Sequence, residues 1–155
     1  MLNLKDIAVK VNRDVAEALA RNLKAMPADK QTWKPLDNGR SALDQVQECA
    51  LINFWVAEIY RTGSVPPFDG EMFEKGKAEL DTVDKACATL AAGTDSLCEA
   101  ILQLSDSDLE ATVTLPWDSS PTTLAELFLV PYWNNAYHIG QISYIQTLYG
   151  DKEYH

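Results

Sequence analysis

Apolar residues recur at steps of three and four along four segments of the chain, which is the spacing of one face of an α-helix. The first segment runs from about Leu4 to Met26, and Pro27 stops it. Its apolar positions are Leu4, Ile7, Ala8, Val11, Val15, Leu19 and Leu23. The residues between them are rich in Lys, Arg, Asp and Glu, so we expect an amphipathic helix with one face in water.

The second predicted helix carries apolar residues on two sides. It follows a connector over residues 27–40, is capped by Ser41 with Asp44 in a capping-box-like position, and runs to about Arg61 before Gly63. One apolar stripe comprises Leu43, Val46, Ala50, Phe54 and Ala57, and the other comprises Ile52, Trp55 and Ile59. A helix that is apolar on both sides is buried on both sides. Either it is central in the protein, or a second subunit covers one face.

A third helical region is predicted after the Pro/Gly-rich loop of residues 62–70. It extends from about Glu71 to Leu104, and Gly93 within it indicates a bend or a frayed turn. The next residues, Ala111–Leu115, alternate between apolar and polar as in a strand. Because one strand cannot make a sheet, we expect residues 105–120 to be extended coil across the helix ends.

The last predicted helix is the most apolar part of the chain. Thr123 and Glu126 form a capping box at its start, and the segment reaches Gly150. Pro131 lies inside it and is expected to kink it. Four long helical segments with no sheet pattern predict an all-α protein, a four-helix bundle, and the length of 155 residues predicts one domain over residues 1–155.

The net charge, the cysteines and the hydropathy of the chain limit its expected partners and its expected compartment. The net charge of −10 argues against nucleic acid as a partner, because phosphate binding needs clustered Lys and Arg. No signal peptide and no apolar run of membrane-spanning length is found, so no membrane contact is expected. Cys49, Cys87 and Cys98 include no CxxC pair and are expected to be reduced core residues, which indicates a cytoplasmic protein.

His138 is the strongest candidate for chemistry, because Asn134 stands one helical turn before it and Gln141 three residues after it. Three polar side chains on one side of an apolar helix must meet each other, another helix, water or a ligand, since burial without a partner costs several kcal/mol. A hydrogen-bonded core histidine is the alternative. No catalytic motif accompanies it: there is no GxSxG and no phosphate-binding glycine loop.

Three segments of the sequence resemble the DinB-like (YfiT-like) superfamily. They are Asn135–Ile142 with Tyr144–Leu148 after it, Arg40–Val46 after Trp33–Lys34–Pro35, and Val113–Trp117. The resemblance covers essentially the whole chain. It implies a bundle with up-down-down-up topology, often a homodimer.

The same resemblance implies a divalent-metal site. In the family, nickel or zinc is bound by three histidines, and the matching positions here are Glu48, Asn134 and His138. Only His138 keeps the family's residue. An amide oxygen is a poor ligand for zinc or nickel, so a Glu/Asn/His set would favour manganese or magnesium if it holds metal at all. A plain Glu48–His138 hydrogen bond across the bundle is the other reading.

Two functions follow from this resemblance. In the first, the chain binds a small molecule through a degenerate metal site that holds no tight metal. In the second, it is a divalent-metal-dependent enzyme, a thiol S-transferase acting with a low-molecular-weight thiol or a hydrolase-like protein. Trp55, Trp117, Trp133 and Tyr137 either line an apolar pocket between helices or belong to the core.

Overall fold

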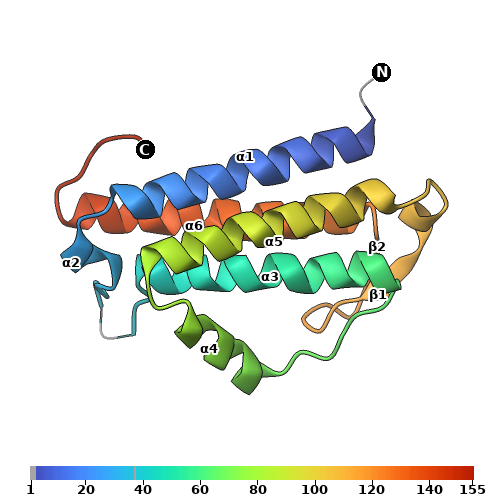
Figure 1. The fold of residues 1–155 in the computed structure, drawn as a ribbon, viewed down its shortest axis with the longest axis horizontal. Coiled ribbons are helices and arrows are strands. Elements are labelled where there is room, and N and C mark those ends of the chain that lie inside the picture. Colours follow the sequence, from blue (N-terminus) through green and yellow to red (C-terminus); the bar gives the residue numbers. More distant parts are fainter. Residues whose placement is uncertain (1–2, 37) are drawn as a thin grey trace.

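Four long helices lie side by side and enclose the apolar interior (Figure 1). The structure is a computed structural model that describes residues 3–36 and 38–155. The long helices are α1 (Leu4–Ala25), α3 (Ala42–Thr62), α5 (Val83–Gln103) and α6 (Leu129–Leu148). The shorter elements are α2 (Ala28–Gln31), α4 (Gly70–Glu79), the 3₁₀ turns η1 (Asp108–Glu110) and η2 (Glu126–Phe128), and the strands β1 (Thr112–Thr114) and β2 (Pro121–Thr123).

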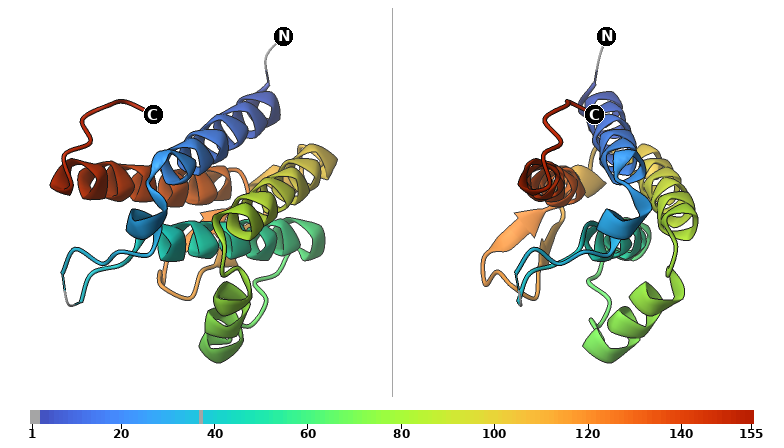
Figure 2. Two further views of the ribbon diagram at one scale, coloured as in Figure 1. Left: turned by 60° about the vertical axis from the view of Figure 1, so that its left-hand side comes forward. Right: turned by 90° about the vertical axis from the view of Figure 1, so that its left-hand side faces the viewer.

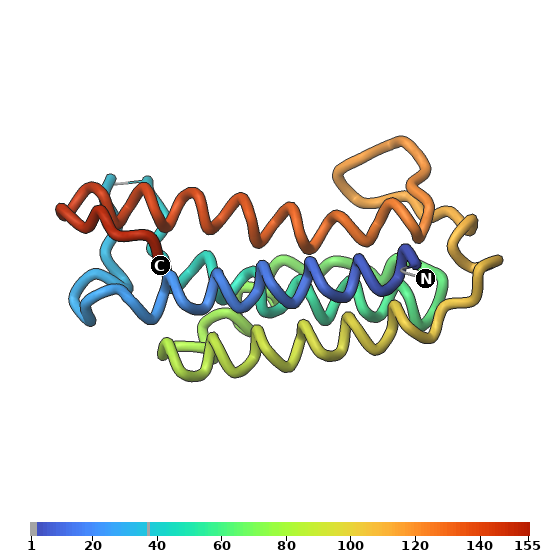
Figure 3. Tube along the Cα trace, turned by 90° about the horizontal axis from the view of Figure 1, so that it is seen from above, coloured from blue at the N-terminus to red at the C-terminus, as the bar shows by residue number. Residues whose placement is uncertain are grey.

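The helices have the expected up-down-down-up topology. α3 and α5 run in the same direction, and α1 and α6 run in the opposite one (Figures 1 and 3). Seen end-on, the order around the bundle is α1, α5, α3 and α6 (Figure 2). Two parallel helices cannot be joined by a tight turn, so residues 63–82, with α4 among them, carry the chain back outside the bundle. The predicted four-helix bundle is confirmed.

The first two long helices begin and end where the sequence predicts. Asn3 and Asp6 form a reciprocal capping box at α1, and the Ser41 hydroxyl accepts from the Asp44 amide at α3. Gly63 ends α3 with φ of 65°, a left-handed conformation that glycine adopts without steric cost. The connector of residues 27–40 differs from expectation because it contains the short helix α2; residue 37 lies outside the described residues.

The third helical region is two helices, and its break is not at Gly93. α4 ends at Glu79, and Thr82 caps α5 by accepting from the Lys85 amide. Gly93 stays inside α5, where it is buried against α3. A glycine at this place is explained by the close approach of two helices rather than by a bend.

The segment after α5 forms a small sheet, which corrects the expected extended coil. Thr112, Val113 and Thr114 of β1 pair antiparallel with Thr123, Thr122 and Pro121 of β2. Pro121 can take part in this pairing because it lies at the end of a two-stranded ladder, where a missing N–H is tolerated. Residues 112–123 are called the hairpin below, and they lie beside α3 and α6 (Figure 2).

The last helix starts in two steps. Thr123 and Glu126 form the predicted capping box, but the element that it opens is the 3₁₀ turn η2. Pro131 is the third residue of α6, within its first turn, where a missing N–H removes no intrahelical bond. The kink expected at Pro131 within the last helix therefore has no cause, because α6 begins only two residues before it.

The second apolar stripe of α3 is covered by the same chain. The ring of Trp55 lies edge-on to Phe68, at 6.3 Å between centroids, and 5.7 Å from the ring of Trp117 in the hairpin. This stripe therefore needs no second subunit to cover it. Cys49, Cys87 and Cys98 are free and buried, as predicted. Within the described residues, no helix is long and apolar enough to cross a membrane.

Candidate functional site

His138 lies in the bundle interior, with 2% of its surface exposed. Its Nδ1 is 2.9 Å from Gln45 Oε1 and 3.0 Å from Gln141 Oε1, and its Nε2 is 3.0 Å from Glu48 Oε1. Nδ1 thus faces two glutamine side chains and Nε2 faces a carboxylate, so each ring nitrogen has a polar partner. The three bonds fix the ring between α3 and α6, the two helices that position the site.

Glu48 is held from two sides. Its Oε1 faces His138, and its Oε2 accepts a hydrogen bond of 2.6 Å from Arg40, whose Nε also donates to Asp44. Burial alone would raise the pKa of Glu48, but the hydrogen bonds from His138 and Arg40 outweigh it and lower the pKa to about 2. The carboxylate is therefore ionised at neutral pH.

A buried lysine extends this charge network to the crossover segment. Lys77 on α4 is 6% exposed and lies 2.7 Å from Asp44 Oδ1 and 3.1 Å from Glu74 Oε1. Asp44 thus joins Lys77 to Arg40, and Arg40 joins Asp44 to Glu48. The network attaches α4 to the start of α3.

The structure brings together two of the three predicted ligands and leaves the third bonded elsewhere. Glu48 and His138 are in direct contact. Asn134 lines the same cavity as Glu48, but its Nδ2 donates to Cys49 Sγ at 3.5 Å. Among the hydrogen bonds of residues 3–36 and 38–155, none joins Asn134 to either partner.

The donor chemistry at this place does not fit zinc or nickel. His138 Nε2 and both oxygens of Glu48 already have partners, and the Arg40 guanidinium is a fixed positive charge beside the carboxylate. Burial raises the pKa of the Cys49 thiol, so it stays protonated and is a poor ligand. In the part of the chain that the structure describes, no group of three His, Cys, Asp or Glu side chains is close enough to hold a metal ion.

A cavity of about 770 Å³ opens beside Glu48, between α3, α6 and the hairpin. It is called the aromatic cavity below. Its lining residues are Glu48, Ile52, Leu115, Trp117, Asp118, Thr122, Val130, Trp133, Asn134, Ala136 and Tyr137. Trp117, Trp133 and Tyr137 are 60%, 78% and 63% exposed. These three rings therefore line a pocket and are not core, whereas Trp55 is half-buried beneath Trp117.

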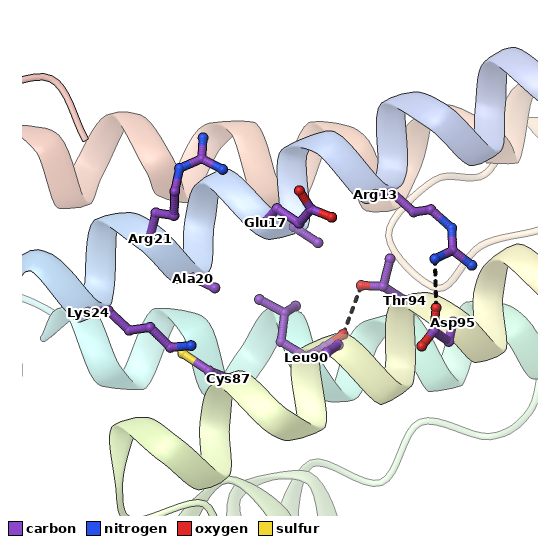
Figure 4. A pocket seen from close by; sticks show the side chains of 11 residues that line it. Arg13, Glu17, Ala20, Arg21, Lys24, Cys87, Leu90, Thr94 and Asp95 are labelled. Carbon is purple, nitrogen blue, oxygen red and sulfur yellow. Dashed lines mark hydrogen bonds and ion pairs between the residues drawn. The ribbon is translucent and has the colours of Figure 1, made fainter.

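A second cavity, of about 450 Å³, lies between α1 and α5 and contains none of the predicted ligands (Figure 4). Arg13, Arg21 and Lys24 of α1 stand along it. Arg13 pairs with Asp95 at 2.9 Å across the groove. Positive side chains can thus gather locally on a chain of strongly negative net charge.

Comparison with known proteins assigns the chain to a family. The family model of the DinB superfamily matches residues 9–142. The chain belongs to the DinB superfamily. No curated protein matches it.

Solved structures with the same fold have diverse activities. YfiT from Bacillus subtilis, described as a probable metal-dependent hydrolase with an unusual four-helix bundle topology, aligns at a TM-score of 0.79 and 16% identity, over 94% of this chain and 87% of that one. A mycothiol-dependent maleylpyruvate isomerase aligns at 0.69 and 14% identity, over 91% and 61% of the two chains. The colibactin self-resistance protein ClbS, in complex with double-stranded DNA, aligns at 0.68 and 14% identity, over 92% and 94%. At these identities the likeness establishes the fold alone.

The exclusion of nucleic acid from net charge is wrong. ClbS has the fold of this DinB-superfamily chain and is found in complex with double-stranded DNA. The physical reason is that net charge sums over the whole surface, whereas phosphate binding depends on local charge. The α1–α5 groove is an example, because the three cations that line it outnumber the carboxylates Glu17 and Asp95, although the chain as a whole is strongly negative.

Three residues of the site were not predicted as such. Arg40 precedes the helix cap, so helical periodicity does not place it, although it stands four residues before Asp44 and eight before Glu48. Gln45 stands three residues before Glu48, a spacing that puts both on one helix face and is a usable signal. Lys77 lies on a separate helix, and its sequence position gives no sign of the contact.

Because the pKa of Glu48 is lowered in the folded protein, the free energy of unfolding depends on pH in the acid range. Ionised Glu48 stabilises the fold above about pH 4.5, the ordinary pKa of this group, and this contribution is lost as the pH falls toward about 2. We expect the difference in unfolding free energy between the wild type and Glu48→Gln to be constant near neutral pH and to shrink on acidification. Urea denaturation from about pH 7 to about pH 3 measures it.

The same substitution at Glu58 is the control, because that carboxylate is half-exposed and its one ion pair among the described residues is with Arg61, at 3.9 Å. A Glu48→Gln difference that stays the same at every pH would contradict the assigned contacts of Glu48.

Proposed function

We propose that this DinB-superfamily protein binds a small organic molecule in the aromatic cavity, without a tightly bound metal. The observation that carries the proposal is the state of Glu48, whose two oxygens are held by His138 and Arg40. A guanidinium beside the carboxylate supplies the positive charge that a metal ion would supply, and it disfavours a second cation there. The remaining space is an open cavity with exposed aromatic walls, a usual setting for a ligand between bundle helices.

Elemental analysis of protein purified without chelator or metal-affinity tag tests the absence of tight metal. We expect a metal-to-subunit ratio near zero that added manganese, nickel or zinc does not raise. The double variant Glu48→His with Asn134→His is the matched positive control, because it completes a three-histidine set with His138. A ratio of about one in the wild type, lost in His138→Ala, would overturn the proposal.

The second candidate is a divalent-metal-dependent enzyme, a thiol S-transferase or a hydrolase-like protein, that uses Glu48, Asn134 and His138. The contact of 3.0 Å between His138 and Glu48 favours it, since both side chains can ligate the same ion once Arg40 moves away. The description of YfiT as a probable metal-dependent hydrolase is a further support. Activity toward thiols that depends on added manganese and disappears in His138→Ala would establish this candidate.

We further propose that the protein is a cytoplasmic homodimer. Three free, buried cysteines support a reducing compartment. Leu129 and Leu148 of α6 are each about half-exposed or more and support an apolar contact with a second copy. We expect the wild type to sediment at twice the subunit mass. A monomer at every concentration would contradict the proposed homodimer.

A further inference from the structure

Three exposed aromatic side chains line the aromatic cavity. Trp133 and Tyr137 stand one turn apart on α6, and Trp117 comes from the hairpin. Exposed tryptophan and tyrosine rings attract cations, because the face of each ring carries negative charge density. Their exposure also means that a ligand can reach them without unfolding any element.

The charged groups of this cavity are all negative. Glu48 lies on its α3 wall and Asp118 on its hairpin wall, and among the described residues that line it none is Lys, Arg or His. The α1–α5 groove differs, since the cations Arg13, Arg21 and Lys24 line it together with the carboxylates Glu17 and Asp95. The lining of that groove therefore carries a small positive net charge, whereas the charged residues that line the aromatic cavity are both carboxylates.

The neighbouring cations are taken up by other carboxylates and do not reach Asp118. Arg40 and Lys77 pair with Asp44, Glu48 and Glu74, and His138 also contacts Glu48. Among the described residues no cation pairs with Asp118, which lies across the cavity from Glu48. One Asp118 oxygen accepts from the Ser120 amide, which leaves the other without a bond among the residues described.

We propose that the aromatic cavity binds an organic cation, a protonated or quaternary amine with an apolar body. This inference rests on the proposed small-molecule function and specifies its ligand class. The charged head lies between the Trp117 and Trp133 rings with Asp118 nearby, and the apolar body lies against Ile52, Leu115 and Val130. Paired aromatic and carboxylate groups select such a ligand over a neutral or anionic one of equal size.

Three soluble probes of similar size test the choice of charge: benzyltrimethylammonium, benzyl alcohol and benzenesulfonate. Binding to the whole chain is followed by NMR chemical-shift changes and by the fluorescence of the exposed tryptophans. We expect the cation to bind about tenfold more tightly than the alcohol, and the anion to bind least.

Two substitutions at exposed positions locate the site. Trp133→Leu removes a ring face but keeps apolar bulk, and Asp118→Asn removes a charge but keeps the shape; each is expected to weaken the cation by about three- to tenfold. Neither should change the affinity for benzyl alcohol by as much. Tyr144→Leu is the matched control, because Tyr144 is 66% exposed on the same helix but does not line the cavity.

The outcomes separate this inference from the function on which it rests. Cation preference lost in Trp133→Leu and Asp118→Asn, with Tyr144→Leu unchanged, would establish it. Equal binding of all three probes, weakened alike by Trp133→Leu, would overturn the cation but keep a small-molecule cavity. Tightest binding of benzenesulfonate would also overturn the cation. Absence of any shift at the cavity residues with any probe would overturn both proposals.

Discussion

Replacement of His138 by alanine is expected to lower the free energy of unfolding by about 3–5 kcal/mol. The substitution removes a ring that is 2% exposed, and it removes a hydrogen-bond partner of Gln45, Gln141 and Glu48. The loss from a core cavity and the loss from unpaired polar groups add in the same direction. Chemical denaturation of wild type and variant, each with and without a chelator, measures the difference.

The chelator separates two roles of His138. A histidine that stabilises through hydrogen bonds gives the same difference in both conditions, whereas a metal ligand gives a difference that vanishes in the chelator. His155→Ala is the control, because the His155 side chain makes a hydrogen bond of 2.9 Å with Asp151 near the chain end. A single hydrogen bond contributes about 0.5–1.5 kcal/mol, so a larger effect there would show that the assay does not isolate the core network.

Gly93→Ala and Gly140→Ala are expected to change stability in opposite directions, although both glycines lie in helices. At Gly93 an added Cβ would lie 2.8 Å from the carbonyl oxygen of Ala50 and 3.2 Å from the Phe54 ring. The ring can move, but the backbone of α3 cannot do so without shifting the helix. We expect Gly93→Ala to cost about 1–3 kcal/mol despite the better helix propensity of alanine.

Gly140 provides the opposite case because it is exposed on α6 and a Cβ there meets nothing within 4 Å. Only the helix propensity changes, so Gly140→Ala should stabilise by about 0.5–1 kcal/mol. Thermal unfolding of the two variants and the wild type measures both changes in stability. A neutral or stabilising Gly93→Ala would show that α3 and α5 are not packed as closely as the structure has them.

Periodicity predicted the long helices well because it reports which face of a helix is buried, and burial dominates their stability. Periodicity failed where contacts between elements determine whether a helix ends or continues. Leu80 continues the apolar spacing from α4 into α5, so the break there is invisible, although Thr82 is an ordinary cap. The glycine that breaks the pattern, Gly93, lies in an unbroken helix because its neighbour α3 requires the space.

The hairpin was missed for a related reason. Ala111–Leu115 carries a strand pattern, but its partner, Pro121–Thr123, is three residues long and begins with proline. So short a strand has no recognisable period, and only the pairing itself defines it.

The site was predicted in part. His138, Gln141 and Glu48 were singled out, and they do meet, because helical spacing and the family resemblance place them on facing helices. Arg40, which together with His138 keeps Glu48 ionised, lies before the helix cap, where no periodic rule applies. The exposure of Trp117 and Trp133 also could not be predicted, since tryptophan in a bundle is commonly core.

The parallel arrangement of α3 and α5 has a kinetic consequence. Antiparallel helices joined by a short turn can form their contacts as soon as both helices exist, but α3 and α5 meet only after residues 63–82 have crossed back. The entropy of closing that loop is lost before the contacts between the two helices compensate for it. The folding rate of this protein should therefore respond more to the length and stiffness of the crossover than to substitutions on the outer helix faces.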